Sequence, residues 1–183
     1  MSETLKAVLA ANARYAANFG AKAELKAPPL RGFGILTCMD CRLYPGTMAG
    51  FREGDAQILR NAGGRPSRDA LRSIAIACRK MGTREWLVIH HTDCGMEALT
   101  DGAHRWEFEE SLRAPGQSAT ESFFDHDDLA WLNSGDARAR LLHAVQRVRA
   151  YPLLLPGTLV HGLMYDVATG LLQVVDEDGG RRG

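Results

Sequence analysis

The sequence predicts an α/β protein in which helices flank a central, mostly parallel β-sheet of about four parallel strands and one antiparallel edge strand. Three short apolar runs of strand length occupy residues 32–37, 56–60 and 86–90. Helix-like segments separate these runs, which is the rhythm of a parallel sheet covered by helices. Two further apolar runs, residues 157–167 and 171–175, are joined by a Thr-Gly turn and predict a closing antiparallel pair.

The first two helices follow from apolar spacing and capping residues. Residues 5–19 carry apolar side chains at helical spacing and predict an N-terminal helix within an arm over residues 1–27. Two prolines follow the arm and end it, because proline cannot continue a helix. Residues 67–81 predict a second helix, with Ser67 as its N-cap and apolar side chains on one face.

The remaining segments complete the expected organisation. Residues 127–149 predict another helix with a break near Gly135, and residues 113–122 have the composition of a polar loop. The final residues, 177–183, are expected to fray. A chain of 183 residues with 45% hydrophobic content can bury one substantial core, so we expect residues 1–183 to form a single domain.

Charge and hydropathy restrict the possible partners. Lysine plus arginine and aspartate plus glutamate number 22 each, so no excess positive charge would attract nucleic acid or an anionic membrane. The richest apolar stretch, residues 151–165, is interrupted by prolines and is too short to span a bilayer. The N-terminus has no basic flank followed by a long apolar run, so we expect a cytoplasmic protein. Its partner is expected to be a small molecule.

Reactive side chains follow the first predicted strand. Four cysteines are too few for a disulfide scaffold in a chain of this length, which favours reduced thiols as ligands or core residues. If the chain stays extended, Cys38, Asp40 and Arg42 share one face. The other face then carries Met39, Cys41 and Leu43. Cys41 has zinc-knuckle spacing from Cys38, but the chain has no second pair of this kind, so packing is favoured for Cys41.

The second half of the candidate site follows the third strand. His91 and Cys94 are three residues apart, a spacing that can converge on one metal where a strand turns into a helix, whereas His90 is assigned to the strand. The carboxyl ends of parallel strands can bring both halves together. Two thiolates and one imidazole, from Cys38, Cys94 and His91, would make a tetrahedral zinc site with one open position.

Together these motifs resemble a known family. Cys38-x-Asp40-x-Arg42 followed by His91-x-x-Cys94 is similar to the paired signature of beta-class carbonic anhydrases. The likeness continues through residues 60–64, and the order of elements fits that family from residue 1 to about residue 176. The His-His-Thr-Asp-Cys-Gly-Met run that ends at Met96 is similar to the short bacterial and mycobacterial forms.

This resemblance implies a zinc hydro-lyase with one Zn²⁺ per subunit, bound by Cys38, His91 and Cys94. Its reaction would be the reversible hydration of carbon dioxide to bicarbonate and a proton by zinc-bound hydroxide. Asp40 would orient that hydroxide through a hydrogen bond, and Arg42 would keep the carboxylate ionised and in place. The resemblance also implies a homodimer or homotetramer, and the apolar N-terminal arm is a plausible element for wrapping a second subunit.

Other functions remain open at this stage. Carbonyl sulfide and carbon disulfide hydrolases resemble the short members of the same family and use the same zinc ligands, so the ligands do not distinguish the substrates. In relatives the Asp can swing onto zinc, and a permanent bond from Asp40 would make a non-catalytic zinc protein. Thiol redox chemistry at Cys38 and Cys41 ranks last, because it leaves Asp40 and Arg42 without a role.

Overall fold

A computed structural model describes residues 1–113 and 124–178 and has a five-stranded sheet at its centre. The strand order is β2-β1-β3-β4-β5, and β1 to β4 run parallel while β5 pairs antiparallel with β4. The strands are β1 (Phe33–Cys38), β2 (Ala56–Asn61), β3 (Glu85–His91), β4 (Leu159–Tyr165) and β5 (Leu172–Asp176). This arrangement confirms the predicted fold class, and the strand boundaries lie within two residues of those expected.

The helices predicted over residues 5–19, 67–81 and 127–149 are all present. The α-helices are α1 (Glu3–Ala17), α2 (Pro45–Met48), α3 (Arg68–Lys80), α4 (Gly102–Ser111), α5 (His126–Leu132) and α6 (Ala137–Arg149). Short 3-10 helices are η1 (Gly20–Glu24), η2 (Ala62–Gly64) and η3 (Gly95–Thr100). The side chain of Ser67 accepts a hydrogen bond from the Ala70 amide and caps α3, as expected. The break near Gly135 separates α5 from α6, and Asp136 caps the second of these helices.

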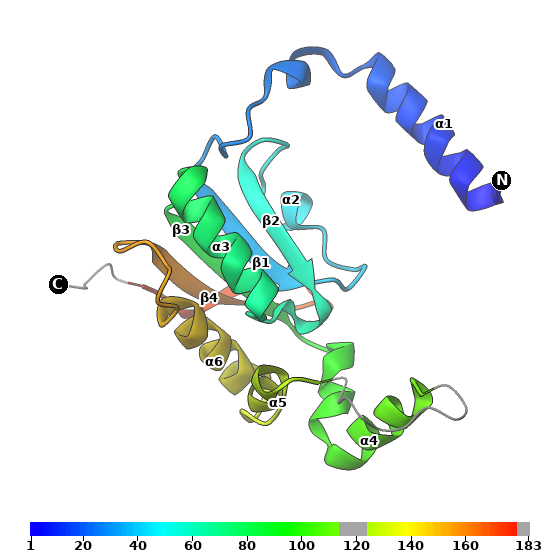
Figure 1. Ribbon diagram of the computed structural model, residues 1–183. Coiled ribbons are helices and arrows are strands. Elements are labelled where there is room, and N and C mark those ends of the chain that lie inside the picture. The colour runs from blue at the N-terminus through cyan, green and yellow to red at the C-terminus, as the bar shows by residue number, and fades with distance from the viewer. Residues whose placement is uncertain (114–123, 179–183) are drawn as a thin grey trace.

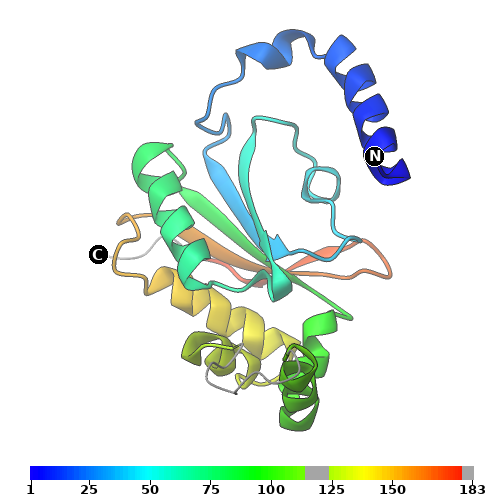
Figure 2. The same cartoon turned by 45° about the vertical axis from the view of Figure 1, so that its right-hand side comes forward.

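The two faces of the sheet are covered unequally. Figures 1 and 2 show α3 and α6 against one face, and the larger core lies beneath them. Ile74 of α3 and Leu141 of α6 are fully buried there against Trp86 of β3. On the other face a smaller cluster forms around Ile35, Phe51 and Ile89. The apolar side chains that pack against this second cluster are only partly buried.

The N-terminal arm stands away from the sheet. Figures 1 and 2 show α1 at a distance from the strands, and none of its residues is buried. The base of the arm is held by Glu53, which accepts a hydrogen bond from the Tyr15 hydroxyl and pairs with Lys22 at 2.5 Å. Leu25 packs against Gly54. The predicted helical arm is therefore present, and its apolar side chains are not covered by the described parts of the chain.

One expectation about the end of the chain needs revision. Residue Asp178 is not frayed, because its amide donates to His161 Nδ1 at 3.1 Å and its carboxylate lies 3.3 Å from Arg149 Nε. Residues 179–183, and the predicted loop at 113–122 apart from Arg113, lie outside the described residues. Helix α4 was not predicted, because none of its residues is buried and its sequence lacks a clear apolar stripe. Within the described residues, no helix has the length and apolarity to cross a bilayer.

Replacing Ile74 by alanine should lower the free energy of unfolding by about 2–5 kcal/mol, because a fully buried side chain leaves a cavity. Ile76 lies on the same helix with 47% of its surface exposed, so Ile76→Ala should change that free energy by less than about 1 kcal/mol. Urea unfolding at one fixed protein concentration measures both values. Equal losses for the two variants would contradict the assigned core.

Candidate metal centre

The candidate site lies where two neighbouring parallel strands end. Cys38 is the last residue of β1 and His91 the last residue of β3, and these strands pair directly. The chain runs from β1 outward to β2 and then returns to the other side of β1, so the site lies at the topological switch point of the sheet. Cys94 follows the end of β3 by one short turn. The sulfur atoms of Cys38 and Cys94 and a ring nitrogen of His91 all lie within 4.8 Å of one another.

The chemistry of these three side chains fits a metal ion such as zinc. His91 Nδ1 lies 2.9 Å from the carbonyl oxygen of Thr92, which fixes that nitrogen as the donor. Its other nitrogen, Nε2, is buried and has no hydrogen-bond partner among the described residues. A buried acceptor is rarely left unpaired, and an imidazole lone pair facing two sulfurs is a suitable zinc ligand. The carbonyl contact is the kind of outer support that orients a ligating histidine.

The electrostatics of the cluster favour a thiolate at Cys38. The hydrogen bond from the Cys94 thiol lowers the pKa of Cys38 to about 3, and His91 and the Gly63 amide act in the same direction. The same contact with Cys38, together with burial, raises the pKa of Cys94. Burial alone would lower the pKa of His91, but the Cys38 sulfur and the Thr92 carbonyl raise it overall. A divalent cation that binds these three groups would displace protons from them.

Asp40 and Arg42 form a fixed pair beside the cluster. Asp40 Oδ1 accepts from the backbone amide and Nε of Arg42 at 2.9 and 3.0 Å, and Oδ2 accepts from Nη2 at 2.8 Å. These hydrogen bonds hold the pKa of Asp40 well below its usual range. Asp40 Oδ2 lies 3.9 Å from His91 Nε2. The carboxylate is therefore ionised, oriented by Arg42 and close to the candidate metal position.

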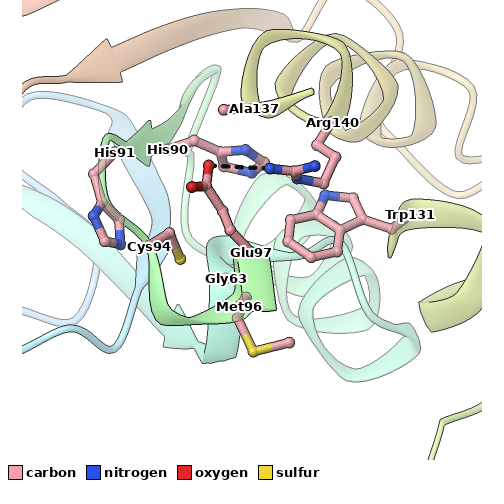
Figure 3. Close-up of a pocket in the computed structure, with 9 residues that line it drawn as sticks. All are labelled: Gly63, His90, His91, Cys94, Met96, Glu97, Trp131, Ala137 and Arg140. Carbon is pink, nitrogen blue, oxygen red and sulfur yellow. Dashed lines mark hydrogen bonds and ion pairs between the residues drawn. The ribbon is translucent and has the colours of Figure 1, made fainter. Parts of the chain in front are cut away.

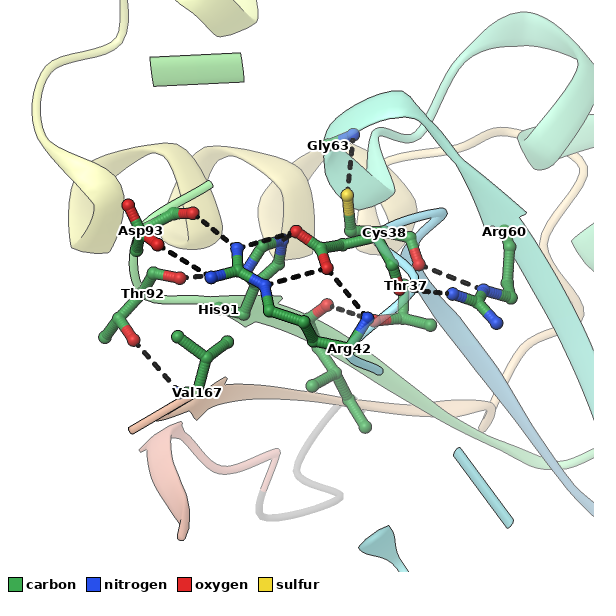
Figure 4. Close-up of polar contacts among 11 residues, drawn as sticks. Thr37, Cys38, Arg42, Arg60, Gly63, His91, Thr92, Asp93 and Val167 are labelled. Atoms are coloured by element: carbon green, nitrogen blue, oxygen red, sulfur yellow. Dashed lines mark hydrogen bonds and ion pairs between the residues drawn. The ribbon is translucent and has the colours of Figure 1, made fainter. Parts of the chain in front are cut away.

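A second anchor for Arg42 comes from the loop after β3. Arg42 Nη1 donates to the Asp93 carboxylate at 2.7 Å, and Nη2 donates to the Asp93 carbonyl at 2.8 Å (Figure 4). Asp93 has a positive φ of 53°, a conformation that few non-glycine residues adopt. The anchoring of Arg42 by Asp93 was not predicted from the sequence. The available signal was an Asp inside the His91-to-Cys94 segment, where a short polar side chain tolerates left-handed backbone.

The end of β2 and the glycines that follow it form a wall of the site. Arg60 donates to the carbonyl oxygens of Cys38 and Asp40 at 3.0 and 2.7 Å, and the Gly63 amide donates to Cys38 Sγ at 3.3 Å (Figure 4). Gly64 has a φ of 64°, and a Cβ there would lie 2.9 Å from the carbonyl carbon of Thr37. Only glycine allows this turn to approach the end of β1 so closely.

The alternation of side chains between two faces, predicted for the residues after Cys38, is only partly present. Asp40 and Arg42 do converge with Cys38, but the chain turns, because the Leu43 amide donates to the Asp40 carbonyl at 3.0 Å. Leu43 is consequently buried. Cys41 is exposed rather than packed in the core, so the packing favoured for it is wrong for this chain. Met39 is also exposed.

His90 behaves as a strand residue, as predicted. It is buried, and burial together with the nearby Arg140 guanidinium lowers its pKa to about 4. Its ring is therefore neutral near neutral pH. The fold and this cluster define an α/β protein with a candidate Cys-His-Cys metal centre at a topological switch point.

Known proteins share this fold and sequence. A family model described as "Carbonic anhydrase" matches residues 33–172. The chain is 35% identical over 167 residues to Beta-carbonic anhydrase 1 of Mycobacterium tuberculosis, covering 91% of this chain and 94% of that protein. It is 32% identical over 165 residues to a carbon disulfide hydrolase of an Acidianus species, covering 80% and 78%. A solved carbonic anhydrase from Glaciozyma antarctica matches with a TM-score of 0.74 and 37% identity, covering 96% and 99%.

The chain therefore belongs to the beta-carbonic anhydrase family, as the paired motif indicated. Both the likeness of the whole sequence and the likeness of the fold support this membership. The family includes relatives with different names for their activity, so membership alone leaves the substrate to be argued from the site.

Replacing Cys94 by serine should remove most of the bound zinc, because one of three ligands is lost. The matched control is Cys41→Ser, which should retain one zinc per chain, since Cys41 is exposed and not part of the cluster. Metal content after gel filtration measures both. Retention of zinc by the first variant, or its loss by the second, would show that the ligand set is different.

Proposed function

We propose that this protein is a zinc-dependent carbonate dehydratase that hydrates carbon dioxide reversibly to bicarbonate and a proton. The observation that carries the proposal is the Asp40 carboxylate, held by three hydrogen bonds from Arg42 beside the Cys38, His91 and Cys94 cluster. A purely structural metal site has no use for an ionised carboxylate fixed at its open side. The 35% identity with a mycobacterial beta-carbonic anhydrase supports the same reaction.

Zinc bound by the three ligands would supply hydroxide near neutral pH by lowering the pKa of water. Asp40 would accept a hydrogen bond from the attacking oxygen and so direct a lone pair toward the carbon atom. Arg42 keeps Asp40 ionised and limits its rotation, because it binds both carboxylate oxygens. Asp93 fixes Arg42 from the opposite side.

The non-catalytic alternative requires Asp40 to occupy the fourth zinc position permanently. The observed contacts argue against that state, because both oxygens of Asp40 are engaged by Arg42 and Oδ2 stays 3.9 Å from His91 Nε2. Swinging onto a metal would break part of this charge-assisted pair. The arrangement therefore favours an open coordination position.

Replacing Asp40 by asparagine should reduce kcat for carbon dioxide hydration by about 10²–10⁴-fold, because the amide no longer accepts the orienting hydrogen bond in the same way. Zinc content should stay unchanged. Asp69→Asn is the control, since Asp69 lies on the exposed surface of α3 in a local pair with Arg72. Stopped-flow hydration with a pH indicator measures the rates. Wild-type activity in the Asp40 variant would contradict the proposed role.

A second substrate class has support from the carbon disulfide hydrolases at 31–32% identity. The same zinc ligands and the same Asp40 and Arg42 pair would direct hydroxide at the carbon of carbon disulfide or carbonyl sulfide. The discriminating experiment is to assay hydration and sulfide release side by side on one zinc-loaded preparation. Fast hydration with little sulfide supports the proposal, whereas efficient sulfide release with slow hydration assigns the chain to the hydrolases.

We also propose that the active form is at least a homodimer. Helix α1 has no buried residue, and Leu5, Val8 and Leu9 are each about half exposed on it. On the thinly covered face of the sheet, Ile58 of the β2 edge strand is 44% exposed. An apolar helix and an uncovered edge strand in one chain are the features that a second copy would bury.

Replacing Leu9 by aspartate should shift the protein from dimer toward monomer, because it places a charge in the apolar surface of α1. Ala11→Asp on the same helix is a control for added charge alone. Sedimentation velocity at several concentrations measures the distribution relative to the 20.0 kDa chain. A wild-type protein that sediments only as a monomer would contradict the proposed assembly.

A further inference from the structure

A small cavity adjoins the candidate metal centre, and neither Asp40 nor Arg42 is among its lining residues. Its walls include His90 and His91 of β3, Cys94 and Met96, Trp131 of α5 and Arg140 of α6 (Figure 3). Its volume is about 10 Å³. This is close to the smallest space that holds one water molecule and too small for a larger ligand.

Besides His91 Nε2, which belongs to the candidate metal centre, two buried polar atoms of the lining residues have no partner among the described residues. Trp131 is 3% exposed and His90 is 5% exposed. Neither Trp131 Nε1 nor His90 Nε2 has a hydrogen-bond partner in the part of the chain that the structure describes. The two rings meet edge to face, with centroids 5.7 Å apart. Buried polar groups in native proteins are almost always satisfied, so two such atoms at one cavity indicate an occupant.

The hydrogen-bonding capacities of the two atoms match those of one water molecule. Trp131 Nε1 can only donate. His90 Nε2 can accept in one neutral tautomer of the ring and donate in the other. Arg140 does not compete for either atom, since its Nη1 donates to Gly135 and its Nη2 to Glu97 at 3.1 Å. One water molecule matches this pair, because it can accept from the indole and can either donate to the imidazole or accept from it.

We propose that this cavity binds one internal water molecule that bridges Trp131 and His90, and that Trp131 is thereby a positioning residue for the metal ligands. His90 directly precedes the candidate ligand His91. The Trp131 ring also packs against Gly63, where a Cβ would lie 2.7 Å from the ring edge. Gly63 in turn donates its amide to Cys38 Sγ at 3.3 Å. Helix α5 therefore contacts, through one side chain, a neighbour of His91 and a hydrogen-bond donor to Cys38.

The water site stands on the cavity and its two polar atoms alone, whereas the positioning role rests on the proposed metal centre. The two parts are tested separately. For the water, the chain offers its own control, because Trp86 is also fully buried but donates its indole N–H to Cys78 Sγ at 3.3 Å.

The first experiment uses full-length protein with ¹⁵N-labelled tryptophan, in metal-free and zinc-loaded forms. The Trp131 indole proton should show a nuclear Overhauser contact with a long-lived water, and Trp86 should show none. Trp131→Phe assigns the resonance by its disappearance. A Trp131 signal without a water contact in both forms would overturn the water site.

The second experiment replaces Trp131 with the benzothiophene analogue of tryptophan, which keeps the shape of the ring and lacks its N–H donor. The dissociation constant for zinc should rise about 10-fold, as is usual when outer support of a ligand is lost. The visible absorption bands of the cobalt-substituted protein should shift. The same replacement at Trp106, which is 61% exposed, is the control and should change neither quantity.

Unchanged zinc affinity and an unchanged cobalt spectrum in the Trp131 analogue would overturn the positioning role. Both readouts are independent of turnover. If the protein fails to hydrate carbon dioxide, the proposed function is contradicted, while the water contact and the zinc affinity still decide this inference.

Discussion

The parallel pairing of β1 with β3 is the constraint on which the rest of the site depends. It brings the ends of two strands that are separated by β2 and α3 in the sequence to the same edge of the sheet. Cys38 and His91 are the final residues of those strands, so their distance is determined by backbone hydrogen bonds rather than by loops. A sheet places side chains at its strand ends precisely, because the hydrogen-bond register between strands can change only by whole residues.

The surrounding turns convert that placement into fixed geometry. Gly64 allows η2 to lie directly against the end of β1, and Arg60 fastens the two carbonyls on either side of Met39. The end of β1, which carries Cys38, thus has a second attachment to the chain. These attachments involve backbone atoms of β1, and a side chain at Gly64 would displace the strand end itself.

Much of this architecture could be predicted from the sequence, because strands and ligands both leave local signals. Apolar runs gave the five strands, and the residue spacing after the first and third runs identified the cluster that the structure brings together. Contacts that depend on turns of the backbone could not be predicted from apolar runs or residue spacing. The turn at Asp40 that exposes Cys41 and the anchoring of Arg42 by Asp93 depend on backbone angles that no periodicity encodes. Helix α4 was missed because its sequence lacks a clear apolar stripe.

Arg42 gives the site an unusual dependency. Its planar guanidinium binds Asp40 on one side and Asp93 on the other, so a carboxylate next to β1 takes its direction from a loop that follows β3. Lysine could not replace it, because an ammonium group lacks the paired donors that hold two partners in one plane. The orientation of the Asp40 carboxylate beside the candidate metal centre is therefore adjustable from a distance. Altering the backbone at Asp93 would change that orientation while Cys38, Asp40, His91 and Cys94 keep their chemical identity.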